Sequence, residues 1–279
     1  MTAKTRFLVL GATAKTGKRV AEKLRSQGHD VRAVSRSTTP AFDWTKPETW
    51  DDALRDIDAI YATFQPDLAV PGSDEIIAAF AKKAIAHGAK RIVMLSGRGE
   101  VAAHRAEDVL RHSGADVTVL RANWFFQNFS EDLFLPYIQQ GALALPAGDI
   151  PEPFIDANDI ADCAVACLLD AKHIGKTYEL SGPNALTFIE VTAILSDATN
   201  RKIDFIPITL DELDAGMAKD GVPEDFRGLI RYLFSEVLDG RNSATTSDVE
   251  QILGRKPNSL RTYAEDVART GLWHIAKSA

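Results

Sequence analysis

The sequence predicts an α/β fold in which a doubly wound parallel sheet of the Rossmann type is followed by a smaller, mainly helical C-terminal lobe. Three observations support this fold class. Short apolar runs rich in β-branched residues alternate with amphipathic stretches through the first half of the chain, which is typical of βαβ units. The first of these runs ends in a glycine-containing turn that opens a helix. Beyond Pro183 the patterns are mainly helical.

The first half of the chain contains five predicted strands and four predicted helices. The strands are expected at residues 7–10, 31–34, 59–62, 91–95 and 117–120. The helices are expected at residues 16–27, 49–55, 73–87 and 100–112. Gly28, Gly88 and Gly114 follow three of these helices, where a C-terminal cap is favoured. Short connections between parallel strands imply right-handed crossovers, and therefore helices on both faces of the sheet.

The second half begins with a segment rich in aromatic residues, from Trp124 to Tyr137. A helix follows, with Asn158 as its expected N-cap, and then a strand at residues 177–180. The remaining elements are helices at residues 189–199, 210–219, 224–238, 247–253 and 260–269, and a short strand at residues 203–207.

Composition restricts the class of protein. The 279 residues are 45% hydrophobic and 25% charged, which is ordinary for a globular protein. The net charge is −7 and no basic block occurs, so we expect no direct contact with nucleic acid. No apolar stretch approaches the roughly 20 residues of a membrane span, and we expect a cytoplasmic protein. A homo-oligomer or a regulatory protein partner stays open.

The strongest motif is the turn Gly11-Ala-Thr-Ala-Lys-Thr-Gly17, which lies between a buried strand and a helix. Gly11 permits a tight turn, and Gly17 permits close packing of the helix on the strand. Backbone N–H groups at the start of the helix then face a pyrophosphate. The middle glycine of the usual pattern is Ala14, so either the turn is wider or Ala14 is unstrained. We place cofactor contacts at Gly11, Thr13, Ala14, Lys15, Thr16 and Gly17.

The end of the second strand predicts which dinucleotide is bound. An acidic residue there would hold the ribose hydroxyl of NAD, whereas an arginine accommodates the 2′-phosphate of NADP. The sequence has Arg36 at this place, and a guanidinium group suits a phosphate in geometry and charge. We therefore expect NADP(H) as the cofactor. Asp43 is either a contact to the adenine edge or an ordinary loop residue.

These motifs resemble those of the atypical short-chain dehydrogenases of the NmrA-like family, which includes NADPH:quinone oxidoreductase type 2 and the festuclavine and agroclavine dehydrogenases. The resemblance extends over nearly the whole chain. It rests on the turn at residues 11–17, on Arg36, and on three further stretches at residues 113–128, 154–161 and 177–183. It implies that loops after successive strands line the cofactor, which places Thr63, Phe64, Gln65 and Ser96 along the ribose and nicotinamide. It also implies that Asn123, Trp124 and Phe125 wall the nicotinamide pocket.

The usual acid of short-chain dehydrogenases is absent from its expected place. These enzymes pair a serine with a downstream Tyr-x-x-x-Lys, in which the tyrosine supplies a proton. Ser96 stands at the end of a strand as expected, but no tyrosine occurs between it and Tyr137. Reduction of a ketone needs a proton for the developing alkoxide, so this chemistry is disfavoured.

Two functions remain. In the first, hydride passes to an acceptor that needs little acid catalysis, such as a quinone, an azo dye or an iminium ion. His104 then orients the acceptor or supplies a proton, together with Ser96 as the second catalytic residue. In the second, the protein binds NADP(H) without turnover and acts as a regulator through a protein partner. We favour the enzyme.

Aromatic side chains at Trp124, Phe125 and Phe126 are expected to line a substrate pocket, although part of this cluster also serves as core. No metal is predicted, because Asp159 lies near a helix start, where the helix dipole stabilises acidic residues. We expect an NADP(H)-binding core over residues 1–182, in which residues 122–148 contribute to the substrate cleft. A C-terminal substrate lobe is expected over residues 183–279.

Overall fold

A computed structural model of the chain describes residues 5–131 and 133–274. The chain forms two compact units, each assembled from three segments. The first unit comprises Met1–Ala122, Ala157–Leu180 and Asp248–Arg255. The second comprises Asn123–Asp156, Ser181–Ser247 and Lys256–Ala279. The division between residues 182 and 183 expected above stays a prediction.

The first unit is built around a six-stranded, fully parallel sheet, which confirms the predicted fold class. Its strands are β1 (Arg6–Leu10), β2 (Asp30–Val34), β3 (Ala59–Ala62), β4 (Arg91–Gly97), β5 (Asp116–Ala122) and β7 (Thr177–Leu180). They lie in the order β2-β1-β3-β4-β5-β7. The chain therefore leaves β1 toward one side of the sheet and returns to its other side at β3. In open α/β sheets, ligands bind at this reversal, beyond the carboxyl ends of the strands.

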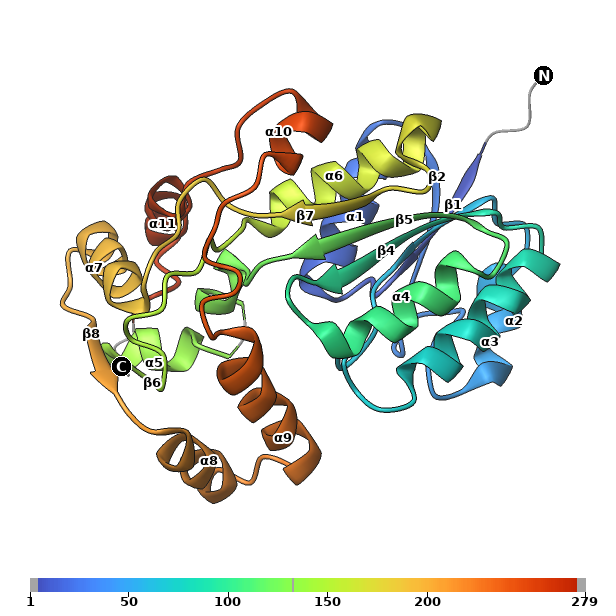
Figure 1. Ribbon diagram of the computed structural model, residues 1–279. Helices are drawn as coiled ribbons and strands as arrows, with labels where there is room; N and C mark the ends of the chain where they lie inside the picture. The colour runs from blue at the N-terminus through green and yellow to red at the C-terminus, as the bar shows by residue number, and fades with distance from the viewer. Residues whose placement is uncertain (1–4, 132, 275–279) are drawn as a thin grey trace. The chain divides into compact units, whose positions relative to one another are not determined.

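Helices cover both faces of this sheet (Figure 1). One face carries α2 (Trp50–Leu54), α3 (Ser73–Ala86) and α4 (His104–Arg111). The other carries α1 (Lys15–Ser26) and α6 (Ala157–Leu169), which pack against each other. A further helix, α10 (Asp248–Leu253), packs against α6 and β7.

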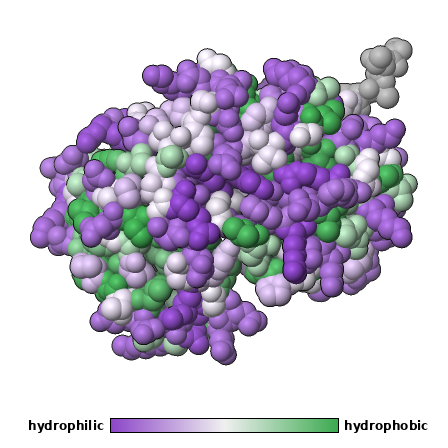
Figure 2. Space-filling view, viewed as in Figure 1, coloured by the Kyte–Doolittle hydropathy of each residue, from purple (hydrophilic) through white to green (hydrophobic). Residues whose placement is uncertain are grey.

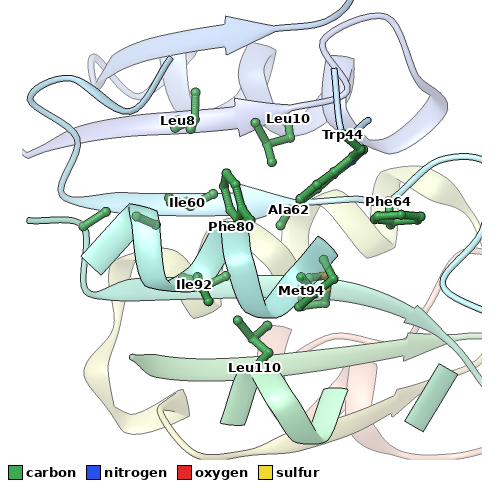
Figure 3. Packing of buried hydrophobic residues seen from close by; sticks show 14 of the residues in the cluster. Leu8, Leu10, Trp44, Ile60, Ala62, Phe64, Phe80, Ile92, Met94 and Leu110 are labelled. Atoms are coloured by element: carbon green, nitrogen blue, oxygen red, sulfur yellow. The ribbon is translucent and has the colours of Figure 1, made fainter. Parts of the chain in front are cut away.

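Alternate residues of the strands supply the core between the sheet and α2–α4. Figure 3 shows side chains of β1, β3 and β4 directed toward Phe80 of α3 and Leu110 of α4. The strand residues in this view are Leu8, Leu10, Ile60, Ala62, Ile92 and Met94. Every one of them is at most 1% exposed. Because both faces of a parallel sheet are covered, its strands read as apolar runs in the sequence.

The second unit combines a small sheet with helices. Its strands β6 (Ala142–Leu145) and β8 (Asp204–Pro207) pair in parallel. Its helices are α5 (Leu135–Gln140), α7 (Phe188–Thr199), α8 (Leu210–Lys219), α9 (Glu224–Tyr232) and α11 (Leu260–Arg269). A π-helical turn, Leu233–Val237, directly follows α9. The sequence predicts neither β6 nor α5, while the other elements lie within a few residues of their predicted places.

The surface is mostly hydrophilic on the face shown in Figure 2. Large hydrophobic residues that are exposed are spread over several elements, and they are Val101, Tyr137, Leu169, Ile189, Ile206, Phe226 and Leu272. Among the described residues, no helix has the length and apolar character needed to cross a membrane.

Candidate functional site

The turn after β1 is held tightly between β2 and β3. Gly11 has a φ of +73°, which favours glycine. A Cβ atom on Gly11 would lie 2.7 Å from Thr63 Cγ2, so the turn passes directly over the end of β3. The N–H of Ala12 donates to the Val34 carbonyl oxygen at 2.9 Å, and the N–H of Ala14 donates to that of Gly11 at 2.8 Å. The reversal of strand order is therefore also where the predicted phosphate-binding turn lies.

Gly17 brings the first turn of α1 against the end of β1. A Cβ atom there would overlap the Gly11 carbonyl group and stand 2.8 Å from the Leu10 carbonyl oxygen. No side chain among the described residues caps this helix, and its first turn contains no acidic residue. Ala14 is extended, with φ −80° and ψ 160°, so its methyl group causes no backbone strain. The positive end of the α1 dipole is thus directed toward the turn at residues 11–17, an arrangement that favours an anion.

The loop after β2 presents Arg36 to solvent. Its side chain is exposed and forms no hydrogen bond or ion pair within residues 5–131 and 133–274. Ser35 and Ser37 flank it with their hydroxyl oxygens 3.1 Å apart. Asp43 accepts hydrogen bonds from the N–H and hydroxyl of Thr45, and the first of these lowers its pKa the most. A free guanidinium group therefore stands where a cofactor phosphate is expected.

The loop after β3 is anchored by a tryptophan that the sequence analysis does not single out. Trp44 Nε1 donates to the Thr63 carbonyl oxygen at 3.0 Å. The Trp44 and Phe64 rings lie 5.0 Å apart, and both side chains are buried. Gln65, by contrast, is exposed. Thr63 thus leaves the sheet beside the turn at Gly11, while the placement of Thr63, Phe64 and Gln65 along the cofactor stays a prediction.

Ser96 at the end of β4 belongs to a buried charge network. Its hydroxyl donates to Glu107 Oε1 at 2.7 Å. Glu107, on α4, is fully buried and also accepts from Arg121 Nη2 at 2.7 Å and from Arg111 Nη2 at 3.1 Å. Burial raises the pKa of Glu107, but the hydrogen bonds from Arg121 and Ser96 outweigh this effect and hold its pKa below the ordinary value. The Ser96 proton is therefore engaged by an ionised carboxylate.

Glu107 was not singled out from the sequence, although a signal for it exists. It lies on the helix face that also carries Ala103, Ala106 and Leu110, all of which are buried. An acidic residue on an apolar helix face requires a partner, and Arg121 at the end of the next strand is that partner.

His104 is the first residue of α4, and its side chain is half-buried. The His104 side chain forms no hydrogen bond with any residue that the structure describes. Its predicted role in catalysis stays a prediction.

The expected pocket residues belong to the second unit. Asn123 Nδ2 donates to Glu152 Oε1 at 2.6 Å, and both side chains are buried. The Trp124 N–H donates to the same carboxylate oxygen at 3.2 Å. The Trp124 side chain and that of Phe125 are half-buried, whereas Phe126 is 1% exposed and packs against Tyr263.

Trp124 is held by other aromatic rings of the second unit. Its ring is parallel to that of Phe134 at 6.4 Å and meets Phe188 edge-on at 6.2 Å. The remaining members of this cluster are Phe129, Phe154 and Phe234. Much of the aromatic segment therefore forms the core of this unit, while Trp124 and Phe125 retain accessible surface.

The residues of the first unit fit a phosphorylated dinucleotide. Gly11 and Gly17 leave no room for side chains, and the positive end of the α1 dipole favours an anion beside them. Arg36 supplies a free positive charge. Residues 11–17, with Thr63, Phe64 and Gln65, are the groups of this unit that would hold such a cofactor.

Comparisons with known proteins agree with this fit. A family model described as NAD(P)H-binding matches residues 11–171, and one described as the NmrA-like family matches residues 102–266. Each covers more than half of the chain. The first match includes the turn, Arg36 and the loop after β3, and it confirms the predicted class of cofactor.

Similar proteins match along nearly the entire length of the chain. An uncharacterized oxidoreductase, YesF of Bacillus subtilis, is 30% identical, with 96% of each protein covered. An NAD(P)H azoreductase of Xenophilus azovorans is 28% identical over 93% of this chain and 96% of its own. The structure of an NADPH-dependent quinone oxidoreductase of Escherichia coli in complex with NADPH has a TM-score of 0.79 at 19% identity. It covers 94% of this chain and 99% of that chain, and it shows the shared fold.

Proposed function

The chain belongs to the NmrA-like family of NAD(P)H-binding proteins, as its motifs predicted, and we propose that it transfers hydride from NADPH to a small electrophilic acceptor of the quinone, azo or iminium type. Its relatives include an oxidoreductase and an azoreductase, and a quinone oxidoreductase shares its fold. The observation that carries the proposal is the turn at residues 11–17, which lies at the reversal of strand order. Gly17 allows α1 to pack against the Gly11 carbonyl group, and Arg36 adds an exposed positive charge after β2.

The described side chains are proposed to bind the cofactor and orient the acceptor. They do not form a serine–tyrosine–lysine site. When bound, NADPH supplies the hydride. The turn at residues 11–17 holds the phosphates, and the Trp44 hydrogen bond keeps Thr63 and Phe64 in place beside it. None of the five tyrosines is followed by lysine four residues later. The Ser96 hydroxyl donates its proton to a hydrogen bond with Glu107. Toward a ligand, its oxygen can therefore accept a hydrogen bond or help to position the ligand. His104 is the residue proposed to orient the acceptor.

Arg36 is the proposed determinant of cofactor preference. A charge-assisted hydrogen bond contributes about 1.5–3 kcal/mol, which is roughly a 10- to 100-fold change in affinity. Arg36→Ala is therefore expected to weaken NADPH binding by about that factor and to leave NADH binding unchanged. Fluorescence titration with both cofactors measures this difference. Arg55→Ala, which removes an exposed arginine at the end of α2, is the control. Equal affinity of the wild type for NADPH and NADH would refute the preference.

The proposed activity is tested by following NADPH oxidation against quinones, azo dyes and cyclic iminium ions, with NADPH binding measured on the same preparation. Oxidation that saturates with an acceptor is the expected result. Tight NADPH binding without oxidation by any acceptor would instead favour a regulatory protein that senses NADP(H). The roles of Trp124 and Phe125 as pocket residues are tested in the same assay, since their replacement by alanine is expected to raise the KM for the acceptor.

A further inference from the structure

Two carboxyl groups meet beside the end of β4. Glu100 follows this strand by three residues and is 8% exposed. Its carboxyl group lies against the Cα atom of Gly97: a Cβ atom there would overlap Oε1 and Cδ of Glu100 and stand 2.5 Å from Oε2. The same side chain is hydrogen-bonded to Asp67 in the loop after β3. The pair is therefore at the edge of the sheet where β3 and β4 end, and this is the edge that carries the phosphate-binding turn.

The hydrogen bond requires a proton on one of the two carboxyl groups, because ionised carboxylates are acceptors only. Asp67 is half-buried, and its Oδ1 already accepts the N–H of Ala69 at 2.8 Å. Glu100 is the more deeply buried of the two. The hydrogen bond forms when Glu100 carries the proton and donates it to a carboxylate oxygen of Asp67. Burial and a neighbouring carboxylate favour the protonated form of such an acid, which is able to donate a hydrogen bond.

The charged groups around Glu100 favour its neutral form. Burial raises the pKa of Glu100 the most, and the charge of Asp67 and the hydrogen bond with it raise it further. Glu107 on α4 adds a smaller effect in the same direction. The nearby cations are engaged elsewhere, since Arg98 pairs with Glu179 at 2.9 Å and Arg121 with Glu107 at 2.7 Å. Within the described chain, no lysine or arginine forms an ion pair with Glu100.

We propose that Glu100, hydrogen-bonded to Asp67 and seated over Gly97, donates the proton that a quinone takes up on reduction. This inference rests on the proposed hydride transfer. The quinone gains two electrons with the hydride as NADPH is oxidised to NADP⁺. The O–H bond of Glu100 breaks as an O–H bond forms on the acceptor oxygen, which completes the hydroquinone. The Glu100 carboxylate then regains a proton from water by way of Asp67.

The proton is needed by some acceptors and not by others, and this difference provides the test. A quinone takes up hydride and a proton, whereas an iminium ion takes up hydride alone and becomes a neutral amine. General acids contribute about 10²- to 10⁴-fold to rate. For Glu100→Gln we expect kcat with menadione to fall by at least about 100-fold, and kcat with a cyclic N-methyl iminium ion to stay within about threefold of the wild type. Glu75→Gln, at an exposed position on α3, is the matched control.

Two further variants alter the environment of Glu100 and leave its side chain intact. Asp67→Asn removes the neighbouring charge, so the pKa of Glu100 falls. Menadione reduction requires protonated Glu100 and declines as pH rises through that pKa; in Asp67→Asn this decline is expected at lower pH. Gly97→Ala displaces the Glu100 carboxyl group by direct overlap and is expected to slow menadione reduction selectively. A purely structural role of the pair would not move the pH profile.

A readout independent of turnover is the protonation state itself. Carbon-13 NMR of the cofactor-free protein, with the Glu100 signal assigned by its loss in Glu100→Gln, is expected to show a neutral carboxyl at pH 7. An ionised Glu100 at pH 7, or equal loss of both activities in Glu100→Gln, would overturn the inference. Full menadione activity in that variant would overturn it and leave the proposed function standing. A wild-type protein that oxidises NADPH with neither acceptor would overturn both.

Discussion

Gly17→Ala is expected to push the first turn of α1 away from the phosphate-binding turn and the end of β1. The new Cβ atom would stand 2.7 Å from the Gly11 carbonyl carbon and closer still to its oxygen, whereas ordinary contacts begin near 3.4 Å. The first turn of α1 must therefore move by more than about 0.7 Å, the difference between these two distances. The neighbouring atoms belong to the backbone, so they do not swing aside. Overpacking of this kind costs about 1–3 kcal/mol of folding stability.

The same displacement moves the N–H groups of α1 away from the cofactor phosphates. Loss of two such hydrogen bonds at about 1.5 kcal/mol each corresponds to roughly 100-fold weaker NADPH binding. The assay is a fluorescence titration with NADPH at a temperature where urea denaturation shows the variant to be folded. Gly216→Ala in α8 is the control, because a Cβ atom there meets nothing within 4 Å. It is expected to keep wild-type affinity and gain up to about 1 kcal/mol in stability. A folded Gly17→Ala protein with wild-type affinity would refute the reasoning.

Two further predictions concern the groups that support the site. Glu107→Ala leaves the guanidinium groups of Arg121 and Arg111 without their buried partner and is expected to cost about 3–5 kcal/mol in urea denaturation. The pKa of Glu107 in the folded protein lies below its ordinary value of 4.5, so this stabilisation is present above that value and is lost as pH falls through the folded pKa. A stability gap between wild type and variant that persists unchanged in strong acid would argue against it. Trp44→Phe removes the donor to the Thr63 carbonyl and is expected to cost about 1 kcal/mol and to weaken NADPH binding, whereas unchanged values on both measures would show that Trp44 does not anchor this loop.

The parallel sheet was predictable because its central strands are mostly buried on both faces. Runs such as Phe7–Leu10 and Ala59–Ala62 are apolar throughout, and the helices between them have amphipathic patterns. The small sheet of the second unit was not predictable in the same way. Ala142–Leu145 is short and becomes a strand by pairing with Asp204–Pro207, which lies far along the chain. The six-residue helix Leu135–Gln140 ends at Gly141 and depends on packing against its unit more than on its own pattern.

The site was predictable where local geometry defines it. Gly11 and Gly17 are separated by one turn, and the close approach between them is a property of that turn. The supporting contacts are long-range, and the sequence offers weaker signals for them. Trp44 reaches Thr63 across 19 positions, and Ser96 reaches Glu107 across 11. Ser96 lies at the end of β4, as the sequence predicts, but the buried carboxylate partners of Ser96 and Asn123, which are Glu107 and Glu152, emerge only when the fold is assembled.

The division of the chain into interleaved segments has a consequence for how this protein is made and altered. The polypeptide passes between its two compact units five times, at residues 122, 156, 180, 247 and 255. Asp248, which accepts the N–H of Glu179 at the edge of the large sheet, is synthesised after most of the second unit. The first unit therefore cannot be completed during synthesis before Asp248–Arg255 has been translated. Nor does a single cut in the gene yield either unit as one fragment, so we expect that exchange of acceptor specificity between relatives proceeds by point substitution in place of shuffling of whole modules.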